Sequence, residues 1–415
     1  MSKAAWQRAL LGNLIDTQKG YAFKSGWYCD AGRRIVKVSN FTEDSIDASA
    51  LTCIPESTAV DYSKYKLFVG DVIVQTVGSW PNNPASVVGK CVRTPSKVAG
   101  SLLNQNAVKL SPSIQLEKQF LFYLLRGEDF KAYIIGTAQG AASQAAITLE
   151  AIRGYEFDLP PLPTQQRIAG ILSAYDELIE NSQRRIKILE TMARALYREW
   201  FVHFRFPGSE NHPRVASALG EIPQGWEVKK LGEIAEEMRR NVPKGNLDEP
   251  QPYVGLEHIP RRSLALDAWE QTIDLGSNKL GFKKGEALFG KIRPYFHKVS
   301  VAPFDGLCSA DTIIVRARHP EDYAFVVACV FSDEFVAHAT ATSNGSKMPR
   351  ANWSVLQDYG VVIPNGEVAE RFSELYVDII AKQQALIFQI QNLRRTRDLL
   401  LPRLLSGQIS VEAAE

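Results

Sequence analysis

PPLPTQQRIAGILSAYDELIENSQRRIKILETMARALYREWFVHF, residues 160–204, is the stretch that decides the architecture of the chain. Apolar residues recur in it in alternating steps of four and three, from Ile168 to Trp200, with Ser182 as the polar exception. This spacing is typical of a coiled-coil seam and predicts a helix of about 37 residues, roughly 55 Å long. A single seam of this kind also fits a plain helix that faces a core.

The same step pattern returns 204 residues later, between Phe372 and Leu404, where Gln383 and Arg397 are the exceptions. Two matched seams in one chain can lie antiparallel, so that each buries the apolar stripe of the other. The positions that we single out, for the helix seam itself or for docking a partner, are Ile168, Leu172, Ile179, Ile186, Leu189, Leu196, Trp200, Phe372, Ile379, Leu386, Ile390, Leu393 and Leu400.

A globular segment precedes each helix, and these segments repeat as well. The first opens with the pattern W-x5-G from Trp6 to Gly12, and the second opens with the same pattern from Trp226 to Gly232. Both close on related motifs that end in Leu-Pro and Ile-Pro, at residues 159–160 and 363–364. The sequence therefore predicts a mixed α/β (α+β) fold with a pseudo-twofold repeat. Two globular domains are joined by two long helices that form an antiparallel coiled coil.

These motifs set the expected domain boundaries. We expect a first globular domain at residues 1–160, a central long helix at 161–205, a plain linker at 206–216, a second globular domain at 217–365, and a last long helix with a tail at 366–415. Short β-branched runs at 34–38, 71–74 and 312–315 predict strands inside the domains. One helix is expected in each, near residues 118–125 and 323–331.

Composition narrows the class of protein. With 45% apolar and 23% charged residues the chain is folded, and 48 Lys+Arg against 46 Asp+Glu leave a charge of only +2. Any binding of nucleic acid must then come from local patches. Five scattered cysteines argue against a disulfide framework. We expect a cytoplasmic protein, because neither a signal peptide nor a membrane-spanning stretch is visible.

Motifs for catalysis are largely missing from the sequence. The six histidines are isolated from one another and from the cysteines, so no metal site is implied. Residues 285–291 meet the phosphate-loop pattern until Ile292 replaces its last hydroxyl, and their apolar interior favours a strand. Asp158-Leu159-Pro160-Pro161 resembles the loop of adenine methyltransferases only superficially, because the second half lacks it. We expect neither catalytic residues nor a metal.

Two stretches favour binding. Residues 279–298 carry six basic side chains with one acid and four interleaved aromatic residues, a composition that suits a nucleic-acid surface. Residues 90–109 are also basic and include the amide-rich Asn104-Gln105-Asn106. Amides can read adenine in the major groove but more often cap turns, and the first stretch also fits a solvated pair of strands.

A family resemblance rests on these segments. Residues 160–204 together with LRRTRDLLLPRLLSGQI at 393–409 resemble the conserved regions of the specificity subunits of type I restriction-modification enzymes. Gly20–Ser25 in the first domain, and residues 290–296 and 348–350 in the second, look like recurrent elements of that family's target-recognition domains. The entry to the second helix, IPNGEVAERF, departs from the family's usual pattern.

The resemblance implies a DNA sequence-specificity subunit that is not itself an enzyme. Each recognition domain would read one half of a bipartite, asymmetric site in double-stranded DNA, and the paired helices would set the spacer. The helices would also dock two modification subunits, and separate restriction subunits would complete the complex. No cofactor is then expected on this chain. S-adenosylmethionine would belong to the modification subunits, and ATP and Mg²⁺ to the restriction subunit.

Base contacts from loops and phosphate contacts from basic patches are the expected mode of binding. The candidate DNA contacts are Lys24, Lys37, Trp80, Asn82, Asn83, Gln105 and Asn106 in the first domain, and Lys291, Arg293, Tyr295, Asn344, Lys347 and Arg350 in the second. Two alternatives stay open. One is a coiled-coil adaptor without DNA specificity, and the other is a DNA methyltransferase fused to its own recognition domain.

Overall fold

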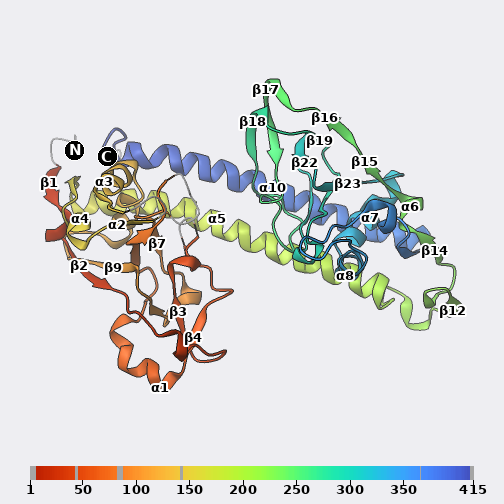
Figure 1. The fold of residues 1–415 in the computed structure, drawn as a ribbon, viewed down its shortest axis with the longest axis horizontal. Coiled ribbons are helices and arrows are strands. Elements are labelled where there is room, and N and C mark those ends of the chain that lie inside the picture. The colour runs from red at the N-terminus through yellow and green to blue at the C-terminus, as the bar shows by residue number, and fades with distance from the viewer. Residues whose placement is uncertain (1–5, 43–44, 82–86, 141–143, 365, 412–415) are drawn as a thin grey trace. The chain divides into compact units, whose positions relative to one another are not determined.

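The computed structural model describes residues 6–42, 45–81, 87–140, 144–364 and 366–411. The chain divides into two compact units (Figure 1). Unit 1 holds residues 1–177 and 394–415, and unit 2 holds residues 178–393. Each unit therefore contains one globular module together with a piece of both long helices.

Each module is built around a four-stranded antiparallel sheet, and the strand order is the same in both. Unit 1 has the order β2 (Ile15–Lys19), β9 (Ala107–Pro112), β5 (Val72–Gln75), β7 (Cys91–Arg93), and unit 2 has β15 (Ala235–Met238), β23 (Thr312–Ala317), β20 (Ala287–Gly290), β21 (Val299–Val301). The apolar strands β5 and β20 are buried along their whole length. Residues 285–291, which resemble a phosphate loop in sequence, are predicted to be a strand. This prediction is confirmed, because β20 lies within them.

A second sheet in each module combines a parallel and an antiparallel pairing. In unit 1 it has the order β4 (Thr52–Ile54), β3 (Arg33–Val36), β8 (Leu102–Leu103), and β3 pairs in parallel with β8. In unit 2 the corresponding strands are β18 (Glu270–Leu275), β17 (Gly245–Val254) and β22 (Gly306–Ser309), extended by β19 (Lys279–Phe282) and β16 (Arg240–Val242). The three strands that the sequence predicts, now β3, β5 and β23, are confirmed.

The opening and closing motifs of each module meet. Strand β1 (Gln7–Leu10) pairs antiparallel with β11 (Glu156–Leu159), and β14 (Glu227–Lys230) pairs in the same way with β24 (Gly360–Ile363). The glycine of W-x5-G is needed at this contact. A Cβ on Gly12 would lie 2.9 Å from the Cβ of Arg153, and a Cβ on Gly232 would lie 2.9 Å from the Cβ of Gln357. The motif thus fastens the two ends of a module together.

Helices cover one face of each four-stranded sheet. Helices α2 (Lys118–Leu124) and α7 (Tyr323–Phe331) confirm the two predicted helices. The expectation of one helix per module is wrong, because α3 (Glu128–Thr137) and α8 (Asp333–Ala341) follow them directly. Each is a short helix without a long apolar repeat, and a neighbouring break, Gly127 or Ser332, starts it. Shorter still are α1 (Glu56–Ala59), α4 (Leu149–Arg153), α6 (Leu231–Ile234) and α9 (Trp353–Leu356).

The long helices α5 (Leu162–Tyr197) and α10 (Gly366–Leu405) run antiparallel within each unit. In unit 1, Ile168 of α5 shares a core with Leu404 of α10. In unit 2, Ile186 shares a core with Leu386, while Trp200 and Phe372 pack with ring centroids 5.8 Å apart. Rising numbers along α5 therefore meet falling numbers along α10. The predicted fold class, two modules on an antiparallel helix pair, is confirmed.

Arg397, a polar exception in the second seam, is 3% exposed and belongs to a buried network in unit 1. Its Nη1 lies 2.7 Å from Oδ1 of Asp176 on α5, and its Nε donates to Asp398. The hydroxyl of Tyr123 on α2 donates to the other oxygen of Asp176 at 2.6 Å. Although burial alone would lower it, the pKa of Arg397 is raised by its two carboxylate partners. The network links both long helices to the module.

The segment expected to be a plain linker, residues 206–216, is partly structured. Phe206 is buried and packs against Trp226 with ring centroids 4.9 Å apart. Strand β12 (Arg214–Ser217) then forms a hairpin with β13 (Gly220–Pro223). The low apolar content of this segment concealed both features.

Two further expectations concern cysteines and membranes. All five cysteines are free thiols, and Cys29 and Cys53 are neighbours in an isolated β-bridge. Over the described part of the chain, no single helix has the length and apolar character of a membrane span; Pro320–Phe331 and Asp333–Ala341 reach it only together, as a pair bent by 61°.

Candidate nucleic-acid interface

In unit 2, the loop after β20 meets a hairpin that precedes α9. The Lys291 amide donates to the Asp311 carbonyl at 3.0 Å, and the Lys291 carbonyl accepts from Ala351 at 2.9 Å. The amides of Asn344 and Arg350 each donate to the other residue's carbonyl, at 3.0 and 2.8 Å, which closes the hairpin. Residues that lie far apart in the sequence are therefore brought to one end of the sheet.

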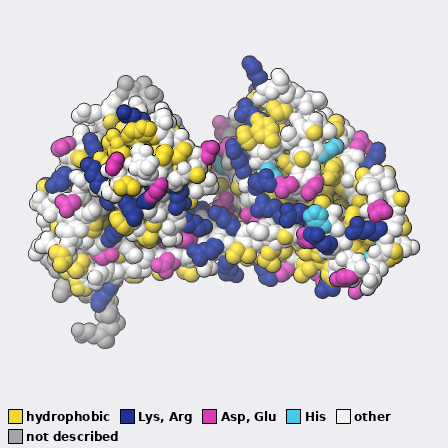
Figure 2. Space-filling model, turned by 90° about the horizontal axis from the view of Figure 1, so that it is seen from below, with side chains coloured by type: hydrophobic (Ala, Val, Ile, Leu, Met, Phe, Trp, Pro, Cys, Tyr) yellow, Lys and Arg dark blue, Asp and Glu magenta, His cyan; other side chains and the backbone are white. Residues whose placement is uncertain are grey.

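Charged side chains of this loop cluster lie around Asp311. The Lys291 ammonium donates to the Ala310 carbonyl at 2.5 Å, and a guanidinium nitrogen of Arg350 lies 3.6 Å from the Asp311 carboxylate. Asn344 and Lys347 are exposed on the hairpin. Figure 2 shows one face of each unit, on which groups of Lys and Arg side chains stand among apolar and fewer acidic ones. The loop cluster combines cations, an amide and one acid at an exposed edge.

The turn at residues 293–297 is backbone-strained. Arg293 and His297 both adopt left-handed conformations, with φ of 50° and 51°, on either side of Pro294–Phe296. Such a conformation costs a residue other than glycine about 1–3 kcal/mol and is found mainly where the surrounding structure enforces it. Tyr295 is 51% exposed at the tip, whereas the Nε of Arg293 is buried.

His297 fixes this turn to the helices behind it. The ring is 2% exposed, and its Nε2 lies 2.9 Å from the Phe331 carbonyl. Burial lowers the pKa of His297, so the ring is neutral at physiological pH and Nε2 donates to that carbonyl. The turn is thus held rigidly, with Tyr295 pointing outward, which suits contact with a groove.

In unit 1, the same backbone hydrogen bonds build an equivalent site. The Thr76 amide donates to the Asn106 carbonyl at 2.8 Å, and the Thr76 carbonyl accepts from Ile147 at 2.9 Å. The amides of Gln139 and Ala146 each donate to the other residue's carbonyl, at 2.9 and 2.8 Å. Both modules therefore present a loop and a hairpin at the same end of the same sheet, with different side chains.

Of the contacts expected in unit 1, Asn106 belongs to this site and Gln105 adjoins it. The side chains of Gln105 and Asn106 are exposed, and the backbone N–H of Gln105 donates to the Tyr21 carbonyl at 3.0 Å. The Lys37 ammonium lies 4.0 Å from the centre of the Tyr28 ring, and that of Lys24 lies over Trp27. Trp80 packs partly buried against the module core, so much of its ring is used in folding. Asn82 and Asn83 lie outside the described residues.

An aromatic cluster beside Gln105 escaped the sequence reasoning. The rings of Tyr21, Tyr62 and Tyr65 lie within 4.5–6.3 Å of one another, and all three are partly exposed. The signal that could have found it was Gly20–Ser25, which contains Tyr21, while Tyr62 and Tyr65 come from a separate helical turn, Val60–Tyr65. A Cβ on Gly20 would lie 1.8 Å from the Asn104 carbonyl oxygen, so only glycine permits this approach.

The singled-out seam positions are all buried or partly buried. Buried are Ile168, Leu172, Ile179, Ile186, Trp200, Phe372, Ile379, Leu386 and Ile390, and partly buried are Leu189, Leu196, Leu393 and Leu400. Their place is the seam, so a surface for a partner must come from other helix positions. Ile188 and Met192 of α5 are 55% and 52% exposed, and Phe388 of α10 is 44% exposed.

Glu257, His258 and Glu270 form a cluster whose ligand atoms lie close enough for a metal ion. The hydrogen bonds favour another interpretation. His258 Nδ1 accepts from the Gly255 amide at 3.0 Å, so Nε2 carries the proton and faces Glu270 Oε1 at 3.3 Å. A metal-binding histidine needs the reverse arrangement. We therefore interpret the group as a His–Glu contact.

Comparisons with known proteins agree with the two-module architecture. The type I restriction modification DNA specificity domain matches residues 4–191. The type I restriction enzyme MjaIX specificity subunit of Methanocaldococcus jannaschii is 25% identical over 74% of this chain and 73% of its own length. The EcoDI specificity subunit of Escherichia coli is 24% identical over 77% of each chain. The chain is similar in sequence to specificity subunits of type I restriction enzymes.

A solved structure supports the same fold. The specificity subunit of the type I restriction-modification system of M. genitalium superposes with a TM-score of 0.56 over 96% of each chain, at 14% identity. At this identity the likeness concerns the fold alone. Two modules with equivalent loop sites and different side chains are the feature of this chain that needs a functional explanation.

Proposed function

We propose that the chain is the DNA sequence-specificity subunit of a type I restriction-modification complex. Each module reads one half of a bipartite, asymmetric site, and the helix pair sets the distance between the halves. The observation that carries this proposal is the repeated loop and hairpin at the end of β5 and β20, built by matching backbone bonds but lined by different side chains.

The site geometry favours division of labour between phosphate and base contacts. Lys347 and Arg350 extend from an exposed hairpin and suit the phosphate backbone, to which most protein–DNA hydrogen bonds go. Asn344 and Gln105 offer exposed amides that can pair with adenine edges in the major groove. Different amides on equivalent frames would make the two half-sites different, as an asymmetric target requires.

The helices supply spacing and partners. Helix α5 has 36 residues and is about 54 Å long at 1.5 Å per residue, which corresponds to at most about 16 base pairs. Exposed apolar side chains such as Ile188, Met192 and Phe388 suit docking of two modification subunits. S-adenosylmethionine would then be held by those subunits, and ATP with Mg²⁺ by a restriction subunit, leaving this chain without a cofactor.

The test is to co-express the chain with its neighbouring modification subunit and to map methyladenine in the host DNA by single-molecule sequencing. We expect a bipartite motif, methylated on both strands, with a spacer below about 16 base pairs. Asn344→Ala should relax only the half-site read by unit 2, and Gln105→Ala only the other half, because each amide lies in one module. Each variant serves as the matched control of the other.

Two results would contradict the proposal. A stable complex that methylates no new motif would point to an adaptor without DNA specificity. Methylation by the purified chain alone would point to a methyltransferase fused to its own recognition domain.

A further inference from the structure

A basic cleft lies in unit 2 at the end of the four-stranded sheet opposite to the loop cluster. Its volume is about 590 Å³, and its lining includes Arg240, Lys283, Lys284, Arg316, Arg318 and His319. Strand β20 begins just after Lys283–Glu286 and ends just before Lys291, so the cleft and the loop cluster lie at its two ends. The family comparison assigns nothing to this cleft, and of its lining cations only Lys283 and Lys284 lie in the basic stretch 279–298 that the sequence marks.

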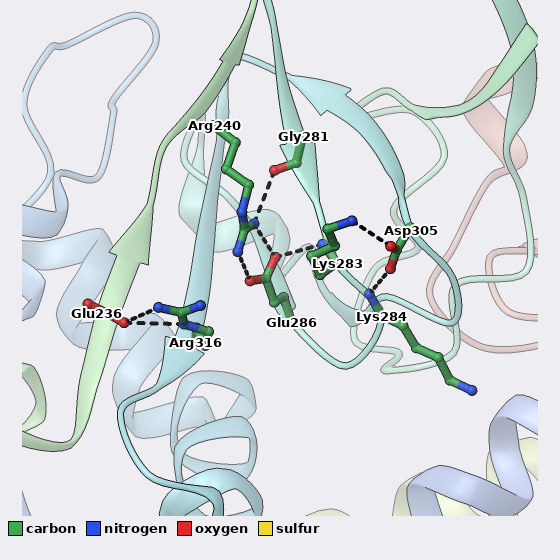
Figure 3. Close-up of polar contacts among 8 residues, drawn as sticks. All are labelled: Glu236, Arg240, Gly281, Lys283, Lys284, Glu286, Asp305 and Arg316. Atoms are coloured by element: carbon green, nitrogen blue, oxygen red, sulfur yellow. Dashed lines mark hydrogen bonds and ion pairs between the residues drawn. The ribbon is translucent and has the colours of Figure 1, made fainter. Parts of the chain in front are cut away.

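Carboxylates hold several of these cations in place (Figure 3). Arg240 binds both oxygens of Glu286, at 2.6 and 2.8 Å, and Glu286 is 5% exposed. The hydrogen bond to Glu286 raises the pKa of Arg240. Arg316 binds Glu236 at 2.6 Å, which lowers the pKa of that carboxyl. The cation array is therefore pre-organised before any ligand arrives.

Positive charge is left over after this pairing. Lys283 pairs with Asp305 at 2.7 Å, whereas the neighbouring Lys284 uses only its backbone amide there. Among the described residues, neither the Lys284 ammonium nor the His319 ring has a hydrogen-bond or ion-pair partner, and Figure 3 shows the ammonium extending away from the paired groups. A pre-ordered array with an unpaired ammonium suits an anion.

The corresponding corner of unit 1 is built on the same turn, but its lysines Lys109 and Lys118 are paired with Asp71. In unit 1 the turn before β5 repeats the turn before β20: the Phe68 amide donates to Asp71 at 2.9 Å, and the Lys283 amide donates to Glu286 at 2.7 Å. The glycines between them, Gly70 and Gly285, both have positive φ, 76° and 88°. Unit 1 nevertheless has Phe68 and Val69 where unit 2 has two lysines.

The next strands differ in the same way. Two residues beyond the end of β9 stands Ile114, 92% exposed, and two residues beyond the end of β23 stands His319. Phe68 and Val69 are also 57% and 60% exposed. A partner that docks on both modules alike would need similar surfaces at the two corners. The two corners therefore expose different side chains, apolar ones in unit 1 and Lys284 with His319 in unit 2.

We propose that this cleft binds the phosphodiester backbone of duplex DNA that flanks the half-site read by unit 2. The inference rests on the proposed DNA-recognition function and extends it. Strand β20 has four residues and spans about 13 Å, which equals roughly four base pairs of duplex. With β20 running along the duplex, contacts at the cleft fall about four base pairs from the bases that the loop cluster reads, and they add affinity without sequence preference.

The experiment measures binding of the full chain, with its copurifying subunits, to two DNA duplexes. Both contain the motif identified by methylation mapping. One duplex extends about ten base pairs beyond the unit 2 half-site, and the other ends about one base pair beyond it. We compare Lys284→Ala and Lys284→Glu with Lys244→Ala, an exposed lysine in the loop between β16 and β17. Lys284 has no side-chain partner, so these changes spare the folded structure.

On the long duplex, Lys284→Ala should weaken binding about threefold and reduce the salt slope by about one, and Lys284→Glu should weaken it further. On the short duplex the variants should match the parent chain, and Lys244→Ala should match it on both. The inference would be overturned if the Lys284 variants bound the long duplex as tightly as the parent chain does, or if they lost the same affinity on the long and the short duplex. Loss of a copurifying subunit at unchanged DNA affinity would assign the cleft to an acidic protein instead. If the parent chain does not prefer the motif over a scrambled duplex, the proposed function itself has failed.

Discussion

The two units differ at one set of equivalent positions where the long helices meet their modules. In unit 1, beside an apolar core, Arg397 of α10, Asp176 of α5 and Tyr123 of α2 share a buried ionic network. In unit 2 the positions 204 residues away, Ala193 and Ile380, are apolar and buried in the large core cluster. The repeat therefore preserves the backbone plan while the buried chemistry of the anchor has diverged.

This difference teaches where specificity of assembly resides. Apolar packing tolerates small shifts of one helix along another, whereas a buried ion pair fits only one register. Unit 2 does bury one carboxylate beside its helices, Glu190, but it accepts hydrogen bonds from Ser263 and Ala265 and has no ion-pair partner among the described residues. Removing a charge should consequently have opposite effects in the two units.

The largest expected effect comes from breaking the ionic anchor. Arg397→Leu leaves Asp176 buried without its partner and should lower the free energy of unfolding by about 3–5 kcal/mol. Urea denaturation, followed by circular dichroism, measures this change.

A triple variant tests whether the loss is due to the orphaned charge. Tyr123→Phe, Asp176→Leu and Arg397→Leu together make the unit 1 anchor apolar, as it is in unit 2, and should recover most of the stability. If the triple variant is as unstable as Arg397→Leu alone, the loss is due to packing and not to the orphaned charge. The proposed difference between the ionic positions of unit 1 and the apolar positions of unit 2 would then be wrong.

A smaller effect is expected where the two units agree. Gly12→Ala and Gly232→Ala each place a Cβ 2.9 Å from the neighbouring side chain, so each should destabilise the chain by about 1–3 kcal/mol. Thermal unfolding of the two variants should give similar shifts. Gly26→Ala is a suitable control, because a Cβ on Gly26 would have open space around it. Gly208→Ala is not a suitable control, because the positive φ of Gly208 would strain an alanine. A loss confined to one of the two would contradict the equivalence of the module ends.

The smallest effect is expected at Glu190. Burial raises its pKa above the ordinary 4.5, so the unfolded chain releases this proton at a lower pH than the folded chain does. Stability is thus lost as the pH rises from about 4.5 through the raised pKa. Glu190→Gln should make the chain slightly more stable than the parent near neutral pH, by less than the glycine effect, and the difference should vanish towards pH 4.5. Urea titrations at several pH values measure it, and a destabilised variant at neutral pH would refute the sign.

Much of the fold could be predicted from the sequence, because the apolar seams and the module motifs repeat at regular spacings. The helix seams gave the antiparallel pair, and the opening and closing motifs gave the module ends, which β1–β11 and β14–β24 join. The second helix of each module, α3 and α8, was missed although it is no shorter than the first, because it buries few apolar side chains: Phe130 and Ile134 in α3, and Phe335, Val336 and Ala339 in α8. The hairpin in residues 206–216 was missed because its strands are polar and exposed.

The candidate site was harder to predict because it is assembled across sequence distance. Lys291 meets Ala351 through a backbone bond, and no local pattern announces a contact between residues 60 positions apart. Residue type alone does not reveal burial, so the sequence predicts DNA contacts at Trp80 and Arg293, which are partly buried, as readily as at the exposed Lys347. The basic cleft combines Arg240 of β16, the turn before β20 and the end of β23. Only Lys283 and Lys284 lie in a stretch that is basic in the sequence.

The pairing of the first and last strands has an evolutionary consequence. Because β1 lies beside β11 and β14 beside β24, the first and last strands of each module lie side by side just before α5 or α10 begins. A stretch of gene encoding one module could then be exchanged for another without moving the seam, provided that the glycine of W-x5-G and the closing strand travel with it. New specificities would arise by inheritance of whole modules, and the scaffold would be conserved while its readers change.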